Sequence, residues 1–302
     1  MLYSRAMGNA SCCAGVDAGP PLTPGLTPWE KIRPALLAGL TVALYCRVLT
    51  ALFSDWLRDP NFSHGFFVPV ISAWIVWSRR AGLAKLEKRP SNWGLLGIVG
   101  AIGILLAGIL GSEVFLARTS LVILIGAMVV FFLGWNWLRE LLFPWLFLLM
   151  MIPIPAIVFN QIAFPLQLLA SKLATALLSM VGVPVLRDGN VISLAAMQLE
   201  VAEACSGIRS LMSLGTLALV YGYFAESKMY KRVILALAAI PIAIAANALR
   251  IFGTGLCVQY WDPSKAEGFF HEFSGWVMFV VSVIFLIVMH SVLNLLDRRR
   301  AA

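Results

Sequence analysis

The sequence predicts an all-α polytopic membrane protein with about eight transmembrane helices and a small extracytoplasmic β element before the sixth helix. Three observations support this fold class. Hydrophobic residues make up 60% of the 302-residue chain and charged residues only 13%, whereas soluble domains carry about 25% charged residues. Apolar stretches recur with a length near the roughly 20 residues that cross a bilayer. Most of the 23 basic residues lie in short clusters between those stretches, as cytoplasmic anchors do.

The apolar stretches also define the expected domain organisation. Residues 1–30 are predicted to form a disordered N-terminal tail, 31–296 a transmembrane domain, and 297–302 a basic cytoplasmic tail. The second candidate span is short, and the fifth ends at a segment with two prolines. The eight candidate spans are approximately 33–54, 63–79, 92–111, 114–134, 137–154, 206–224, 233–256 and 271–294.

The distribution of charge predicts the topology. With the N-terminus inside, fifteen basic residues fall on inside segments, four on outside segments, and the remaining four of the 23 within spans. This positive-inside bias predicts that both termini are cytoplasmic and that the bilayer is the main partner of the chain. The net charge of +8 is therefore explained without nucleic acid, which we exclude as a partner.

The long segment from about 155 to 205 is predicted to lie outside. Its first half, 156–181, is apolar but interrupted by polar residues, so it is either an amphipathic helix in the interface or a ninth span. A ninth span would place the following cysteine inside, against the charge distribution. In the second half, Asp188-Gly189 between two apolar runs predicts a hairpin. Alternation of apolar and polar residues over 197–202 predicts another strand.

Cys205 is the strongest candidate for a nucleophile. It ends the strand-like stretch and begins the sixth span, and the unpaired N–H groups and positive dipole end of a helix start favour a thiolate. Glu203, Ser206 and Gly207 flank it, and Gly207 would let a substrate backbone approach closely. Arg209, four residues on, shares a helix face with Cys205. The alternative is an inert cysteine packed at a helix start.

Two further residues are expected at the same depth. Arg250 lies in the outer half of the seventh span, where an arginine costs about 3 kcal/mol and usually faces a partner or a polar cavity. Asn247, three positions earlier, shares its face. His271 begins the eighth span, and histidine is the usual partner that activates a thiol. A structural ion pair of Arg250 with Glu200 or Glu203 remains the alternative for that residue.

The first outside loop contains a second group of polar residues. Ser63 and His64 are adjacent there, so their side chains diverge if the backbone is extended. We expect this loop to position substrate or to have a structural role, although His64 remains an alternative base to His271. His290, deep in the last span, is expected to pack or to pair helices. The sequence has no residues at the spacing of metal ligands or of a cofactor-binding motif, so we predict neither a metal nor a cofactor.

Three motifs together resemble the exosortase/archaeosortase family. They are Ala204-Cys205-Ser206-Gly207-Ile208-Arg209, then Asn247-Ala-Leu-Arg250, then His271 before the last span. Ser63-His64-Gly65 is also similar, and the resemblance covers about residues 35–295. It implies catalytic roles for Cys205, Arg250 and His271. Archaeal relatives tend to carry arginine in place of the histidine, so His271 implies a bacterial type.

The resemblance also implies what the enzyme acts on. Its substrates would be secreted proteins with a C-terminal PEP-CTERM-like signal, made of a short motif, a transmembrane helix and a basic tail, in cells that produce exopolysaccharide. The expected activity is that of a cysteine transpeptidase or protease at the outer face of the bacterial inner membrane. Both transfer and hydrolysis remain open. The alternatives are a polytopic transporter, a polysaccharide polymerase and a non-catalytic assembly protein.

Overall fold

The computed structural model describes residues 28–195, 197–201, 207–260 and 269–301. The contacts divide the chain into two compact units, with the boundary between Cys46 and Arg47. The first unit contains the helix α1 (Pro28–Leu44). The second unit contains all other described elements and every predicted site residue that the structure describes.

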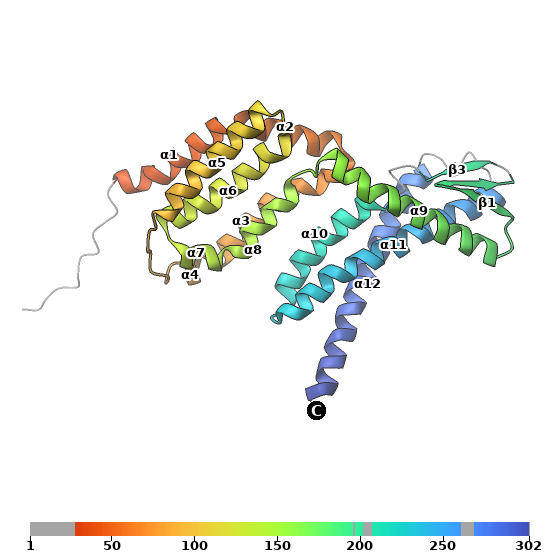
Figure 1. Cartoon of the computed structure of the whole chain (residues 1–302). Helices are drawn as coiled ribbons and strands as arrows, with labels where there is room; N and C mark the ends of the chain where they lie inside the picture. Colours follow the sequence, from red (N-terminus) through yellow and green to blue (C-terminus); the bar gives the residue numbers. More distant parts are fainter. Residues whose placement is uncertain (1–27, 196, 202–206, 261–268, 302) are drawn as a thin grey trace, which may run out of the picture. The chain divides into compact units, whose positions relative to one another are not determined.

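Helices make up most of the second unit, which also holds one small sheet (Figure 1). Two short 3₁₀ helices, η1 and η2, interrupt the α-helical run in its first half. The helices are α2 (Cys46–Arg58), η1 (Pro60–Phe66), α3 (Phe67–Ser78), α4 (Arg80–Leu83), α5 (Trp93–Leu110), α6 (Val114–Phe132), α7 (Trp135–Glu140), α8 (Leu142–Phe147), η2 (Leu148–Met151), α9 (Ala156–Met180), α10 (Ile208–Ala225), α11 (Met229–Tyr260) and α12 (Phe269–Ala301).

Six helices of the described chain are long and apolar enough to cross a membrane, or seven if α1 and α2 together form one broken span. Five of the six coincide with predicted spans: α5, α6, α10, α11 and α12. The sixth is α9, a continuous helix of 25 residues, for which the sequence left an interfacial helix and a ninth span open. The polytopic helical class is thus confirmed, whereas the predicted number of eight spans is not.

Three predicted spans are not single long helices. The stretch 33–54 is divided between α1 and α2. The stretch 63–79 consists of η1 and α3, and α3 has only 12 residues. The stretch 137–154 is divided among α7, α8 and η2. Gly134 begins this region with a φ of 96°, and a Cβ there would lie 2.0 Å from the carbonyl oxygen of Arg89. Glycine is therefore required at this break, and Pro153 and Pro155 separate η2 from α9.

The predicted hairpin and third strand form one antiparallel sheet. Its strands are β1 (Val185–Asp188), β2 (Val191–Leu194) and β3 (Gln198–Glu200), in the order β1-β2-β3. Asp188 pairs with Val191, so Gly189 and Asn190 make a two-residue turn. Gly189 has a φ of 60°, which suits such a hairpin.

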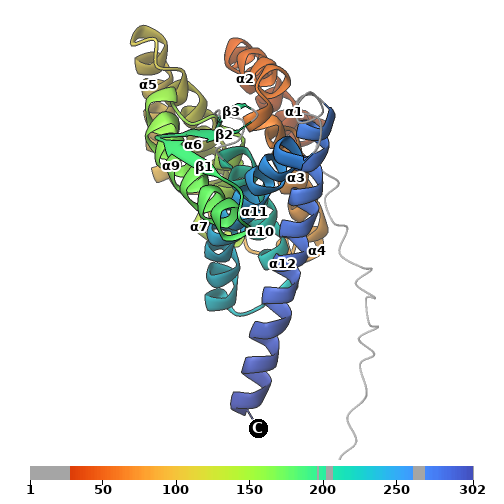
Figure 2. The same ribbon diagram turned by 90° about the vertical axis from the view of Figure 1, so that its right-hand side faces the viewer.

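The sheet packs on the C-terminal halves of two long helices, as both ribbon views show (Figures 1 and 2). Ile192 and Leu194 of β2 share a buried apolar core with Ala174 and Leu178 of α9 and Val258 of α11. A 32-residue helix such as α11 is about 48 Å long, more than the roughly 30 Å of a bilayer core. The end of α11 that carries the sheet can therefore extend beyond the hydrocarbon.

A second core joins α10, α11 and α12, with Leu214, Leu235 and Leu286 fully buried. At one end of this three-helix group lies a polar cluster. The Nε2 of His290 is 2.7 Å from Glu226 Oε1, and the Nζ of Lys231 is 3.5 Å from the same oxygen. The hydroxyl of Tyr221 lies 2.6 Å from His290 Nδ1. His290 thus pairs helices, as the sequence predicts.

Candidate functional site

The candidate site is built where β3 leads into α10. Val201 follows β3 and is buried, and Gly207 is the residue before the first turn of α10. Glu203, Cys205 and Ser206, which the sequence singles out, lie outside the described residues. Val201 and Gly207 are the described residues on either side of them in the chain.

Gly207 lies against the side chain of Asn247 in α11. A Cβ atom at position 207 would come within 3.0 Å of the Cβ and Cγ of Asn247. Gly207 also adopts a left-handed conformation, with a φ of 79°, in which residues with a side chain are strained. Both requirements explain the glycine at this position, and the contact fixes the start of α10 on α11.

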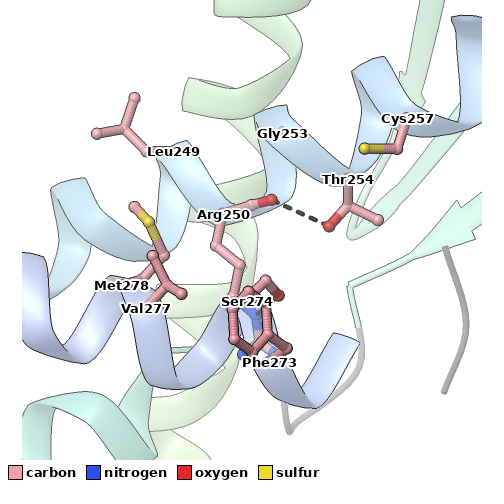
Figure 3. A pocket seen from close by; sticks show the side chains of 9 residues that line it. All are labelled: Leu249, Arg250, Gly253, Thr254, Cys257, Phe273, Ser274, Val277 and Met278. Atoms are coloured by element: carbon pink, nitrogen blue, oxygen red, sulfur yellow. Dashed lines mark hydrogen bonds between the residues drawn. The ribbon is translucent and has the colours of Figure 1, made fainter. Parts of the chain in front are cut away.

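Arg250 lies one helical turn after Asn247 and reaches across to α12. Its Nε donates a hydrogen bond of 3.2 Å to the hydroxyl of Ser274, and Figure 3 shows the side chain extending toward Ser274 and Phe273. The guanidinium also covers Gly275, where a Cβ would lie 3.3 Å from Arg250 Cζ. The first turns of α12 therefore hold the cation close to the helix backbone.

His271 belongs to the first turn of α12, which begins at Phe269. It lies three residues before Ser274 and four before Gly275, and residues at these spacings share one face of a helix. The structure thus brings the helix positions of Asn247, Arg250 and His271 to one region, where α11 meets the start of α12.

A cavity of about 280 Å³ opens beside Arg250, between α11 and α12 (Figure 3). Leu249, Gly253 and Val277 contribute apolar walls, and the cavity also contains the half-buried thiol of Cys257. Thr254 donates from its hydroxyl to the carbonyl oxygen of Arg250 over 3.0 Å. The cavity is mostly apolar, with Arg250 as its charged group among the lining residues, and this environment strengthens the guanidinium's attraction for a negative oxygen.

The segment η1 packs on the first turn of α10. The Nε of Arg209 lies 3.4 Å from Asn61 Oδ1, and Asn61 is buried. Arg209 itself is exposed. The loop that contains Ser63 and His64 therefore adjoins the start of α10, which begins three residues after the predicted nucleophile in the sequence.

Ser63 and His64 differ in exposure. Ser63 is exposed, and its hydroxyl donates to Pro60 O over 3.1 Å within its own turn. His64 is buried, with its Nε2 at 3.2 Å from Met150 O of η2. Burial lowers the pKa of His64 below its ordinary value of 6.5, although the backbone contacts with Met150 and Asn61 oppose the shift. Within the described ranges, its Nδ1 has no hydrogen-bond partner.

This arrangement suits chemistry in which negative charge develops on an oxygen atom. A guanidinium held by a neighbouring helix is already oriented, so it would stabilise an oxyanion without reorganisation. A neutral, buried imidazole at His64 is available as an acceptor, while the start of α12 carries the second histidine. Among the described residues, no group of three or more His, Cys, Asp or Glu side chains is placed to hold a metal ion.

Sequence reasoning missed three residues of this region. Ser274 and Gly275 hold the guanidinium of Arg250, and Asn61 contacts Arg209. The spacing of Ser274 and Gly275 from His271 is the one pattern that points to them, because i+3 and i+4 neighbours share a helix face. Nothing in the local sequence indicates the contact between Asn61 and Arg209, which are 148 residues apart.

Comparison with known families identifies the chain. The family model described as Transmembrane exosortase (Exosortase_EpsH) matches residues 56–288, more than three quarters of the chain. The matched region contains every candidate site residue, from Ser63 to His271. Neither the comparison with curated proteins nor that with solved structures found a match.

Proposed function

Because this chain belongs to the transmembrane exosortase family, we propose that it is a membrane-embedded cysteine transpeptidase or protease. It would cleave the C-terminal PEP-CTERM-like sorting signal of secreted proteins at the outer face of a bacterial inner membrane, through a thioester on Cys205. The observation that carries the proposal is the chain of contacts from Gly207 to Asn247 and from Arg250 to Ser274 and Gly275.

Chain length supports the assignment of the nucleophile. Cys205 is two residues from Gly207, and two residues extend at most about 7 Å. Gly207 contacts Asn247, one turn of α11 from Arg250. The predicted nucleophile is therefore two residues along the chain from a contact with the turn of α11 that precedes Arg250. Position 271 lies on the same part of α12 as Ser274 and Gly275, which contact the guanidinium.

The proposed reaction has two steps. The imidazole of His271 takes the proton of the Cys205 thiol, and the thiolate attacks the carbonyl carbon of the scissile peptide bond. Arg250 stabilises the oxyanion, the C–N bond breaks, and the departing amine of the signal takes the proton from His271. An acceptor amine or water then attacks the thioester and gives up a proton to the imidazole, which passes it to the departing thiolate and so restores the thiol. Transfer to an amine is the outcome that the family favours.

The supporting residues have positioning roles in this proposal. Asn247 fixes the start of α10 through Gly207 and orients the face of α11 that carries Arg250. Arg209 connects that start to η1 through Asn61, so that Ser63 and His64 form the rim against which the sorting signal lies. Glu203 and Ser206 flank the nucleophile and are expected to orient the substrate backbone.

The test is processing of a co-expressed secreted reporter that carries a sorting signal. Cys205→Ala and Cys205→Ser should both abolish the shift in reporter mass at normal enzyme levels. Cys257→Ala is the matched control, because its thiol lines the cavity beside Arg250 but has no proposed chemical role. If Cys205→Ser keeps activity while Arg250 and Arg209 variants lose it, the chain is instead a transporter or polymerase that binds an anion.

The proposed topology has its own test. Both termini would be cytoplasmic, and Cys205 would face the periplasm. In a variant that retains Cys205 alone among the five cysteines, a membrane-impermeant maleimide should label the thiol in intact spheroplasts. Labelling only after the membrane is opened would place the thiol in the cytosol and contradict both the topology and the catalytic proposal.

A further inference from the structure

A second cavity lies far along the helices from Arg250, where α3 and α10 end and α11 begins. Its volume is about 540 Å³, and α7, α8, α10 and α11 form its walls together with Arg79, which follows α3. Three arginines, Arg79, Arg139 and Arg232, line it, against a single carboxylate, Glu140. One end of the cavity is therefore strongly cationic.

Two of these arginines face the same aromatic ring. The Cζ atoms of Arg79 and Arg232 lie 5.1 and 5.2 Å from the centre of the Tyr223 ring. Glu140 is 3.7 Å from Arg79, and no second carboxylate is among the lining residues. Arg139 is exposed, and no ion pair of its side chain occurs within the described ranges. Like charges gathered this closely favour a bound anion.

The hydroxyl of Tyr223 supports the same conclusion. Tyr223 is 8% exposed, and among the described residues its buried hydroxyl has no hydrogen-bond partner. An unsatisfied buried hydroxyl is costly, and this cost is offset if the hydroxyl donates a hydrogen bond to a ligand oxygen. The hydroxyl belongs to the ring that the guanidinium groups of Arg79 and Arg232 face, so an anion bound by these arginines would lie close to it.

The remainder of the cavity is apolar and open to the side. Phe143 stacks on Tyr223 with ring centres 4.0 Å apart. Beyond it lie Leu142, Leu146 and Leu237, which are 46, 44 and 59% exposed. Leu237 lies five residues along α11 from Arg232, or about 7.5 Å deeper. A soluble anion would leave these side chains uncovered, whereas an acyl chain would cover them.

From this combination we propose that the cavity binds one anionic glycerophospholipid. Its phosphate would lie among the three lining arginines, Arg79, Arg139 and Arg232, beside Tyr223, and one acyl chain would follow α8 and α11. Basic pockets between membrane helices recognise acidic headgroups in this way. The basic tail of a sorting signal is excluded, because the arginines repel it. The inference does not depend on the catalytic proposal.

The experiment uses the purified full-length protein and native mass spectrometry. Phosphatidylglycerol and phosphatidylcholine with identical acyl chains are offered in equal amounts. One molecule of phosphatidylglycerol should be retained in preference, and Arg139→Gln or Arg232→Gln should each lower that preference about fivefold. Tyr223→Phe should lower it as well, although the ring remains. Ala236→Trp should abolish retention by filling the apolar wall.

The matched control is Arg80→Gln. Arg80 is exposed, stacks on Trp77 at 4.5 Å and does not line the cavity, so its loss should leave lipid retention unchanged. Arg232 also donates to Glu226 O, but Arg139→Gln removes no such contact and keeps the test independent of folding. Three results would overturn the proposal: equal retention of both lipids, a loss of preference with Arg80→Gln as large as that with Arg139→Gln, or displacement of the lipid by inorganic phosphate.

Discussion

Gly207 and Asn247 are packed so closely that a Cβ atom at position 207 would come within 3.0 Å of the asparagine side chain. This contact joins the start of α10 to the turn of α11 that precedes Arg250. Since the left-handed φ of 79° at Gly207 also disfavours any side chain, the junction admits glycine alone without distortion.

Gly207→Ala should therefore abolish processing of a sorting-signal reporter while the protein still inserts into the membrane. The left-handed conformation costs about 1–2 kcal/mol for alanine, and the contact with Asn247 forces α10 away from α11. Gly215→Ala is the matched control, since it lies in the same helix with open space around it. Full processing by Gly207→Ala would show that this junction does not position the reaction.

Arg250→Gln should lower the rate of processing by about a hundredfold or more, because removal of one oxyanion donor has that effect in other acyl-transfer enzymes. Ser274→Ala should lower it about fivefold, as expected when a positioning hydrogen bond is lost. The two rates are measured as single-turnover processing by purified enzyme. If Ser274→Ala lowered the processing rate as much as Arg250→Gln, or if Arg250→Gln were fully active, the proposed role of Arg250 would be wrong.

Acidification should destabilise the packing of η1. Burial lowers the pKa of His64 below 6.5, so the unfolded chain takes up a proton before the folded chain does. The stability that the neutral imidazole contributes is complete above pH 6.5 and is lost as the pH falls through 6.5 toward the lower folded value. Asp59, at the start of η1, and Arg209 of α10 are the neighbouring charged groups.

The midpoint of thermal unfolding should fall by on the order of a few degrees between about pH 7.5 and pH 5.5. His64→Gln should flatten this dependence, because glutamine can donate to Met150 O without titrating. His271 and His290 remain in both proteins, so the difference reports position 64. Parallel pH profiles for the two proteins would contradict this assignment.

The polar cluster at the other end of α10, α11 and α12 should be structural. The Lys231 and Glu226 side chains are 6 and 10% exposed, so Lys231→Met leaves a buried carboxylate with less compensation. The unfolding temperature should fall by on the order of 5 °C. Lys228→Met is the control, because Lys228 is exposed and pairs with Asp297 at the surface, where ion pairs contribute little. If both substitutions lowered the unfolding temperature equally, the distinction between the buried Lys231 pair and the exposed Lys228 pair would be wrong.

Local patterns predict much of this fold. The apolar stretches that form α5, α6, α10, α11 and α12 are long and contain few charged residues, so their hydropathy alone identifies them. The hairpin at Gly189 is equally local, since its turn chemistry and the alternation around it lie within a few residues. In these cases each element is specified by its own residues.

Other features depend on tertiary contacts. The helix α9 includes Asn160, Gln161 and Lys172, so its sequence alone does not distinguish a span from an interfacial helix, and its continuity follows from packing on α11. Conversely, 137–154 is apolar but broken at Leu141 and after Met151. In the candidate site, the sequence singles out Arg250, but its partner Ser274 is set by the way α12 meets α11.

The core beneath the sheet also has a consequence for biogenesis. Ile192 and Leu194 of the sheet are covered by Ile251 and Val258 of α11, more than 50 positions later in the chain. During synthesis the strands are made first, and they have no complete apolar cover until the end of α11 has emerged. The sheet is therefore expected to mature only after α11 is inserted, so that the nascent chain completes this region late in its own translation.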